Sequence, residues 1–322
     1  MNRQISVSFI TILINKRSKG YKEDKRSTGA NMVKSPLNYI GGKSKLLTQI
    51  IPRFPPQIET FVDLFAGGCN VGLNVRAKRT IFNDNLTYLI DLYRKLQELS
   101  TEEIFEHINK RIDTLGLSKT NEVGYLALRS EYNAHKNPLD LFVLVAYSFN
   151  HQIRFNSNHQ FNLPFGKNRS HYNKTTERKL HSFLKRVKEM DCTFSNVSFE
   201  NFDFSDMTKE DLVYCDPPYL ISTGSYNDGK RGFKGWTHTE EKCLLDLLDS
   251  LDDRGVRFGL SNVLEHKGEE NNLLKDWVGD RGYNLYPLNF DYKNSSYQGI
   301  SKGETKEVLI TNYPTTYSLL FF

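Results

Sequence analysis

Short apolar runs that end in polar turns recur along the chain and predict the strands of a sheet. Runs of four or five apolar residues bounded by turn residues are typical of strands buried on both faces. The run 212–215 is a clear example, and the polar segment 216–219 follows it directly. The predicted strands are one that begins at Thr60, followed by 79–83, 212–215, 256–260, 285–292 and 307–313, of which the last two form a closing hairpin.

Between residues 86 and 188 the apolar residues change to helical spacing, which predicts a mainly helical insert. Amphipathic helices are indicated at 89–99 and 104–112, and a buried helix at 139–149 that Asn150 ends. Residues 152–166 then predict a β-hairpin with a polar tip. We therefore expect a sheet domain formed by 35–87 and 189–322, an insert formed by 88–188, and a leader formed by 1–34.

Three further helices are indicated near the predicted strands. Apolar residues at helical spacing predict one over 44–51. A second is expected after the glycine-rich turn that follows the strand beginning at Thr60. The third is predicted over 242–251, with Thr237 or Thr239 as its cap.

The leader holds eight Lys and Arg against two acidic residues, a charge of +6, although the whole chain carries only +5. Its apolar segment, 5–14, precedes the charges and is too short to span a bilayer, so it is not patterned as a secretory signal. We expect Met32 to be the natural start and the leader to be poorly ordered; a short membrane anchor is the alternative.

Composition favours a soluble protein, because 38% of the 322 residues are hydrophobic and 25% are charged. The four cysteines lie far apart without a C-x-x-C pair, which argues against zinc sites and disulfides and fits a reducing cytosol. Cys215 fits a buried strand residue better than a nucleophile. We expect a cytoplasmic monomer that uses no metal and contacts no membrane.

The segment Asp216-Pro217-Pro218-Tyr219 carries the most specific chemistry. Ligand-binding groups of open α/β sheets lie beyond the carboxyl ends of the strands. The prolines stiffen this turn and leave its carbonyl groups free to accept hydrogen bonds. Asp216 adds a charged acceptor and Tyr219 an aromatic face. Together they suit the –NH2 group of a planar base, although a rigid turn after a strand is the simpler interpretation of four residues.

Glycines after the strand that begins at Thr60 indicate a ligand site. The sequence Asp63-Leu64-Phe65-Ala66-Gly67-Gly68 lets the backbone approach a ligand closely. Asp84 ends the next strand, at a position where an acidic residue holds ribose hydroxyls. A nicotinamide-dependent dehydrogenase remains open on the turn alone, but the turn is not G-x-G-x-x-G.

The order of these motifs resembles one enzyme family. Asp216 to Tyr219 resemble motif IV of the methyltransferases that act on exocyclic nitrogens of DNA bases, with aspartate typical of adenine-N6 enzymes. Phe65 to Gly68 resemble the motif I that binds S-adenosyl-L-methionine (AdoMet), and Gly41-Gly42-Lys43 resemble motif X. The order motif X, motif I, insert, motif IV is that of DNA adenine-N6 methyltransferases of the Dam and DpnII type, from about Leu37 to Tyr313.

The resemblance implies a Rossmann-like α/β methyltransferase sheet, mostly parallel with an antiparallel last strand. It further implies methyl transfer from AdoMet to N6 of a flipped adenine in double-stranded DNA, in a restriction-modification system, a mobile element or an orphan methylase. Tyr39 stands where Dam has tryptophan, and Asn38 where it has lysine. The implied catalytic residues are Asp216, Pro217, Pro218 and Tyr219; the implied cofactor-binding residues are Tyr39, Gly41, Gly42, Lys43, Asp63, Phe65, Gly67, Gly68, Asp84, Phe202 and Asp203.

Residues 167–188 carry eight Lys and Arg against one Glu, and such dense positive charge suits DNA phosphates, although charge runs also form solvated helix faces. The preceding hairpin supplies polar groups for base edges. Candidate DNA-binding residues are Arg154, Asn156, Asn158, His159, Gln160, Lys167, Arg169 and Lys174. Alternatives are a cytosine-N4 methyltransferase on the same scaffold and a non-catalytic DNA-binding protein; the recognition sequence is left open.

Overall fold

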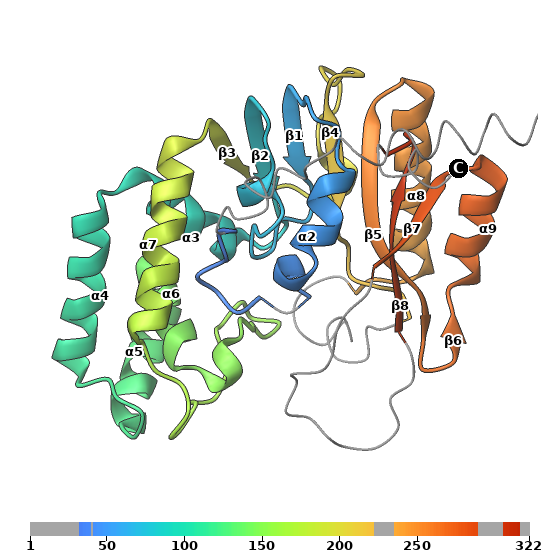
Figure 1. The fold of residues 1–322 in the computed structure, drawn as a ribbon. Helices are drawn as coiled ribbons and strands as arrows, with labels where there is room; N and C mark the ends of the chain where they lie inside the picture. Colours follow the sequence, from blue (N-terminus) through green and yellow to red (C-terminus); the bar gives the residue numbers. More distant parts are fainter. Residues whose placement is uncertain (1–31, 40, 222–234, 289–304, 316–322) are drawn as a thin grey trace, which may run out of the picture. The chain divides into compact units, whose positions relative to one another are not determined.

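The strands form one mixed sheet in the order β3-β2-β1-β4-β5-β8-β7 (Figure 1). The computed structural model describes residues 32–39, 41–221, 235–288 and 305–315. Strands β3, β2, β1, β4 and β5 are parallel, whereas β8 is antiparallel to both β5 and β7. The bounds are β1 Thr60–Asp63, β2 Arg79–Asn83, β3 Cys192–Ser195, β4 Leu212–Cys215, β5 Arg257–His266, β6 Glu269–Glu270 (paired with β5), β7 Asn284–Leu288 and β8 Thr305–Thr311.

By their contacts, the described residues from Val33 onward belong to one compact unit. Apart from residues 32–34, the predicted leader lies outside the described residues. The same holds for the glycine-rich segment after Tyr219, from 222 to 234, and for 289–304 between the last two strands.

The order in which strands are added to the sheet changes direction between β1 and β4, which are parallel neighbours, and we call this point the sheet reversal. From β1 the chain adds β2 and β3 on one side, and then β4 and β5 on the other. In open α/β sheets such a reversal leaves a crevice beyond the carboxyl ends of the two central strands. Both strands are buried almost throughout, which explains their apolar runs. The fold therefore places the residues after Val62 and after Cys215 next to each other.

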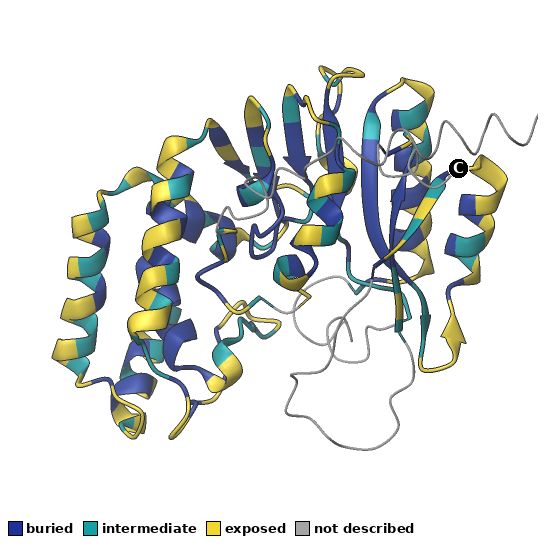
Figure 2. Cartoon of the chain, in the orientation of Figure 1, coloured by how far each residue is buried: buried dark blue, intermediate teal, exposed yellow. Residues whose placement is uncertain are grey.

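The predicted insert is helical and lies beyond the β3 edge of the sheet (Figure 1). Every residue of α6 after Pro138 is buried (Figure 2), whereas α7 buries only a stripe that includes Leu180, Phe183, Leu184 and Val187. The insert shares one apolar cluster with Phe82 of β2 and Phe194 of β3. Its helices are α3 Thr87–Glu98, α4 Thr101–Leu115, α5 Glu122–His135, α6 Pro138–Tyr147 and α7 Lys174–Glu189; the remaining α-helices of the described residues are α2 Leu47–Ile50, α8 His238–Asp253 and α9 Asn272–Arg281.

Side-chain caps fix several helix ends. Ser100 and Glu103 form a capping box at α4, and Thr237 and Glu240 form one at α8. The predicted cap Thr237 is confirmed, and α8 begins four residues earlier than the apolar pattern indicated. Helix α4 ends at Gly116, whose φ of +55° suits glycine.

Four local predictions differ from the structure. Only a three-residue 3-10 turn, Gly72–Asn74, stands where a helix was expected after the glycine turn, because β2 begins at Arg79. The helix predicted over 44–51 is split into short 3-10 and α segments. Strand β5 runs to His266, well past Leu260, because β8 pairs along it. The hairpin at 152–166 has isolated bridges in place of regular strands.

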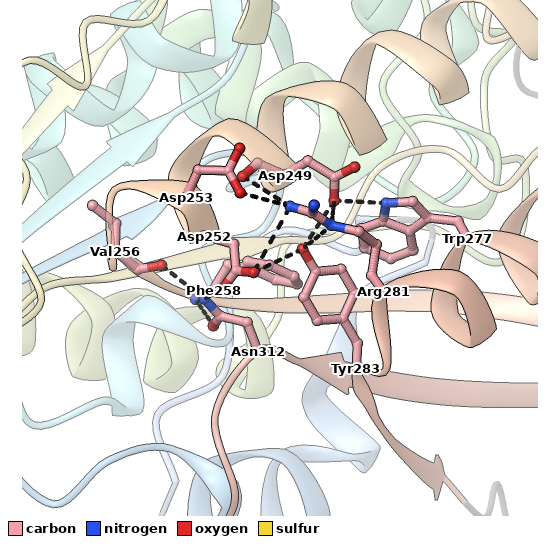
Figure 3. A network of polar contacts seen from close by, with 9 residues as sticks. All are labelled: Asp249, Asp252, Asp253, Val256, Phe258, Trp277, Arg281, Tyr283 and Asn312. Carbon is pink, nitrogen blue, oxygen red and sulfur yellow. Dashed lines mark hydrogen bonds and ion pairs between the residues drawn. The ribbon is translucent and has the colours of Figure 1, made fainter.

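A polar network joins α8, α9 and the outer strands on the side away from the insert (Figure 3). Arg281 of α9 lies 3.0 Å from both Asp249 and Asp253 of α8. Trp277 and Tyr283 donate hydrogen bonds to Asp249. Because charge-assisted hydrogen bonds are stronger than neutral ones, this network ties α9 to α8 at the antiparallel end of the sheet.

Candidate active site

Three carboxylates meet at the carboxyl ends of the central strands. Asp63 ends β1, Asp84 follows β2 and Asp216 follows β4. Asp63 and Asp84 are only 2% and 8% exposed. Burial raises the pKa of Asp63 to about 7, and the charges of Asp216 and Asp84 act in the same direction. The site therefore holds excess negative charge that a cationic ligand would stabilise.

Asp84 shapes the glycine turn. Its two oxygens accept hydrogen bonds from the N–H groups of Gly67 and Leu86, each at 2.9 Å. Burial raises the pKa of Asp84 and these bonds oppose the increase. Gly67 has a φ of +45°, and a Cβ atom there would lie 2.8 Å from the ring of Tyr39. Glycine is therefore required both by the backbone and by the packing of Tyr39.

Asp63 holds the end of the same glycine-rich segment by a hydrogen bond. Its Oδ2 accepts a hydrogen bond from Gly72 N at 3.0 Å. Gly68 is close-packed, since a Cβ there would lie 3.0–3.1 Å from Asn70, Ser35 and Tyr39. Phe65 lies next to Phe199 and Trp236, with ring centroids 5.5 and 5.7 Å away. The turn thus lies between buried carboxylates and a group of aromatic rings.

Lys43 reaches the residue expected to be catalytic. Its Nζ lies 2.7 Å from Asp216 Oδ1 and 3.4 Å from Glu307 Oε1, and donates to the Gly41 carbonyl at 2.9 Å. The side chain is 5% exposed. Burial raises the pKa of Asp216, while Lys43 opposes this increase and Glu307 adds to it. The expected AdoMet contact of Lys43 is untested, and its contact with Asp216 was not predicted.

Tyr219 completes this group. Its hydroxyl lies 3.0 Å from Asp216 Oδ1 and 2.8 Å from Glu307 Oε1, and Lys43 Nζ lies 5.0 Å from the ring centre. Pro217 is buried and Pro218 is half-buried. Glu307 was not among the predicted site residues. The only signal for it was its place in the closing segment 306–310, which resembled the family.

Phe202 and Asp203 follow the 3-10 turn Phe199–Asn201. Phe202 is half-buried, stacks near Phe204 and packs against the same apolar cluster as Phe65. Asp203 is exposed, and the pKa of its carboxyl is lowered by a hydrogen bond from Ser205 N. The contacts of Asp203 among the described residues do not include Asp63, Asp84 or Asp216, so its role toward AdoMet stays a prediction.

The hairpin tip is organised by Asn156. Its Oδ1 accepts from the N–H groups of Asn158 and Gln160, and its Nδ2 donates to Gln160 Oε1. Arg154 donates both to the side chain and to the carbonyl of Asn162. Asn156 and Arg154 therefore hold the loop, whereas Asn158, His159 and Gln160 are exposed.

The basic run divides into two groups. Lys167, Arg169 and Lys174 are exposed. Arg186 instead donates to the carbonyls of Leu73 and Val75, and Lys188 donates to that of Leu99. A cavity of about 580 Å³ lies beside the exposed group and is lined by Asn38, His151, Asn173, Lys174, Lys179 and apolar residues of α6. Only part of the predicted phosphate-contacting run is therefore available to a partner.

The fold and the carboxylates at the sheet reversal are those of an AdoMet-dependent methyltransferase. The chain belongs to the D12 class of N6 adenine-specific DNA methyltransferases, whose family model matches residues 39–293. This confirms the predicted fold class and family.

The chain is also similar in sequence to three curated relatives. The modification methylase StsI of Streptococcus sanguinis is 52% identical over 91% of this chain and 45% of its own length. The type II methyltransferase M.FokI of Planomicrobium okeanokoites is 52% identical over 89% and 44%. The DNA adenine methylase of Salmonella typhi is 28% identical over 75% and 82%. The chain thus spans less than half the length of the first two relatives.

The residues present fit AdoMet, which carries positive charge on its sulfonium and amino groups. Among the described residues, the three neighbouring carboxylates Asp63, Asp84 and Asp216 have the cationic side chain of Lys43 beside them. A cationic ligand offsets this imbalance. Among the described residues, no cluster of His, Cys, Asp and Glu could hold a metal ion, and no helix is long and apolar enough to cross a bilayer.

Proposed function

We propose that this protein is a site-specific DNA methyltransferase that transfers a methyl group from AdoMet to N6 of adenine in double-stranded DNA. The observation that supports this most directly is Asp216 at the sheet reversal, between Lys43 and Tyr219 and next to the acidic site around Asp63. Two relatives are named modification methylases or type II methyltransferases, so we propose a restriction-modification role in the cytoplasm.

The adenine amino group has two hydrogens to place. In the proposed mechanism one is accepted by Asp216 and the other by the Pro217 carbonyl. These bonds favour a tetrahedral nitrogen with a localised lone pair, so catalysis rests on positioning and electrostatics. The base must leave the DNA stack to reach Asp216, and Tyr219 offers it a ring face.

AdoMet supplies an activated methyl group on a sulfonium. We assign its binding to the glycine turn and its surroundings. Asp63 and Asp84 face its positive charge and its ribose, respectively, while Phe65 and Phe202 border its adenine. Tyr39 holds the turn at Gly67, and the segment Gly41-Gly42-Lys43 lies between the turn and Asp216. Asp203 is proposed to accept from the adenine amino group.

The function is tested by incubating the protein with labelled AdoMet and duplex DNA and then separating the nucleosides. The expected product is N6-methyldeoxyadenosine in one sequence context, identified by sequencing of the methylated DNA. Label in N4-methylcytosine would contradict the assigned base. Retained AdoMet and DNA binding without label transfer would contradict the assigned activity.

Binding of AdoMet is expected to depend on pH through Asp63. Because the pKa of this carboxyl is about 7, it is largely protonated below pH 7 and cannot face a cation as an anion. Apparent affinity should therefore rise by up to about tenfold per pH unit until pH 7 and then level off. Calorimetry in buffers of different ionisation enthalpy should also detect proton release on binding.

The matched variant is Asp63→Asn, which keeps an oxygen for the Gly72 N–H group. It should bind AdoMet more weakly at pH 8 and lose most of the pH dependence. If AdoMet affinity changed with pH in the same way in both proteins, the proton released on binding would come from a group other than Asp63.

For DNA we propose that exposed cations hold phosphates and the hairpin tip reads bases. Replacing Lys167 and Lys174 by glutamine should weaken binding to target and scrambled duplexes equally. The slope of log affinity against log salt should fall by about two units, roughly one for each phosphate contact. Lys185→Gln, on the exposed end of α7 near Glu189, is the matched control and should change little.

Replacing Asn158 by alanine tests the reading of bases. Its backbone bond to Asn156 is retained, so the hairpin should stay folded. We expect a loss of about 1–3 kcal/mol on the target duplex and little change on a scrambled one. Equal losses on both duplexes would place recognition elsewhere. Lys167, Arg169 and Lys174 hold the backbone in this proposal, and Asn158, His159 and Gln160 face the bases of a duplex bound by a monomer.

A further inference from the structure

Lys43, Asp216, Tyr219 and Glu307 form one polar group drawn from three parts of the chain. Lys43 precedes α2, Asp216 and Tyr219 follow β4, and Glu307 lies on β8. The ion-pair and hydrogen-bond distances within the group are 2.7 to 3.4 Å. The Glu307 side chain is 11% exposed. Its contacts are with the groups nearest Asp216, so its charge acts at the proposed methyl acceptor.

The charges in this group do not cancel. The Lys43 ammonium has three protons, and among the described residues the Gly41 carbonyl, Asp216 and Glu307 accept them. One ammonium thus faces two carboxylates, which leaves a net charge of −1 when both are ionised. Without Glu307, Lys43 would cancel the charge of Asp216. Glu307 therefore supplies the excess negative charge at this end of the site.

The Tyr219 hydroxyl also has fewer protons than carboxylate neighbours. The Tyr219 hydroxyl has one proton but lies within hydrogen-bond distance of two carboxylates. With one additional proton, both contacts become complete hydrogen bonds. The hydroxyl thus connects Asp216 Oδ1, at 3.0 Å, with Glu307 Oε1, at 2.8 Å, so a proton that arrives at Asp216 has a path to Glu307.

We propose that Glu307, acting through Tyr219, receives the proton that adenine N6 loses on methylation; this rests on the proposed function. The N6 lone pair forms the bond to the methyl carbon, and the electrons of the broken S–C bond stay on sulfur. N6 then carries a positive charge and one proton too many. Asp216 accepts that proton on Oδ1, the oxygen 3.0 Å from the Tyr219 hydroxyl, and passes it to the Tyr219 oxygen as the hydroxyl proton moves to Glu307 Oε1.

The same arrangement favours the transfer itself. Positive charge moves from the sulfur to N6 as the methyl group moves, and the net negative group lies on the N6 side. Preorganised charge of this kind stabilises the transition state more than the ground state. Glu307 is thus a positioning residue that acts through other groups: it adds negative charge near N6 and receives the proton by way of Tyr219. Asp216 is the residue that contacts the base.

The test compares Glu307→Gln with the wild type in single-turnover methylation across pH. Glutamine keeps an oxygen for Tyr219 and removes the charge. The rate constant on the pH plateau should fall by about a hundredfold, within the range for proton-transfer groups. AdoMet Kd and duplex Kd should stay within about twofold. The acid limb of the rate profile should move to lower pH, because Glu307 raises the pKa of Asp216.

Two further measurements separate this role from a structural one. Urea unfolding of the ligand-free proteins should show Glu307→Gln at least as stable as the wild type at pH 8, since it removes a carboxylate next to Asp216. In a Tyr219→Phe background, which keeps the ring but removes the hydroxyl, Glu307→Gln should cost clearly less than a hundredfold. Both results would support the proton route through Tyr219.

Several results would overturn the proposal. A folded Glu307→Gln protein with wild-type rate and acid limb would remove Glu307 from the reaction. A loss confined to AdoMet or DNA affinity, with no shift of the acid limb, would assign it a purely structural role. An equal loss in both backgrounds would exclude the Tyr219 route. If the wild type itself transfers no label to adenine, it is the proposed function that fails.

Discussion

Replacing Asp216 by alanine is expected to reduce methyl transfer by at least about a thousandfold, or roughly 4 kcal/mol of barrier. In the proposed mechanism Asp216 accepts a hydrogen bond from the adenine amino group. Alanine removes both this acceptor and its negative charge. AdoMet Kd should stay within about threefold, because Asp63 and the glycine turn are untouched. The measurements are single-turnover label transfer and titration calorimetry.

Asp216→Asn is the matched control for shape. It keeps one acceptor oxygen and the volume of the side chain but loses the charge that faces Lys43. We expect its rate to lie between those of the wild type and the alanine variant. A rate for Asp216→Ala within about tenfold of wild type, in a folded protein that binds AdoMet, would contradict the role of Asp216.

Local pattern predicted the parts of the fold that local physics determines. The strands at Thr60, Arg79 and Leu212 are central in a parallel sheet, so both faces are apolar and their runs are recognisable. The buried helix ending before Asn150 and the cap at Thr237 are likewise encoded within a few residues. The family resemblance added the order of motifs and, through it, the methyltransferase class.

What the sequence did not reveal depends on tertiary pairing. Glu307 reaches Asp216 only because β8 inserts antiparallel between β5 and β7, and a single acidic residue on a strand gives no sign of this. The structural role of Arg186 and Lys188 was not predicted either, since both belong to the basic run 167–188 yet donate to backbone carbonyls of other segments. Helix α9 has a weakly amphipathic sequence and was not predicted.

The role of Lys43 is the clearest example of this limit. The Gly41-Gly42-Lys43 segment indicated a cofactor site by resemblance, and in the structure the ammonium lies against Asp216 and Glu307. Both assignments are compatible, because the segment lies between the glycine turn and Asp216. Its energetic role can be measured without any ligand.

Lys43→Met is expected to destabilise the protein by about 3–5 kcal/mol at pH 8, because removing one partner of a buried ion pair leaves an uncompensated charge. Asp216 and Glu307 would then face each other without a cation. The pKa of Asp216 is already raised by burial, and losing Lys43 raises it further. A carboxyl with a raised pKa in the folded state loses stability as pH rises, so the variant should recover part of its stability at pH 5.

Urea unfolding at pH 5 and pH 8 provides the measurement, and Lys45→Met provides the control. Lys45 lies two residues further on and is exposed, so its replacement should change stability by less than about 1 kcal/mol. Adding Glu307→Gln to Lys43→Met should restore part of the loss at pH 8, because only one carboxylate then remains. Equal destabilisation at both pH values, or no rescue by Glu307→Gln, would mean that Lys43 acts through packing. The predicted pattern instead requires that the ammonium stabilises two carboxylates brought together at the sheet reversal.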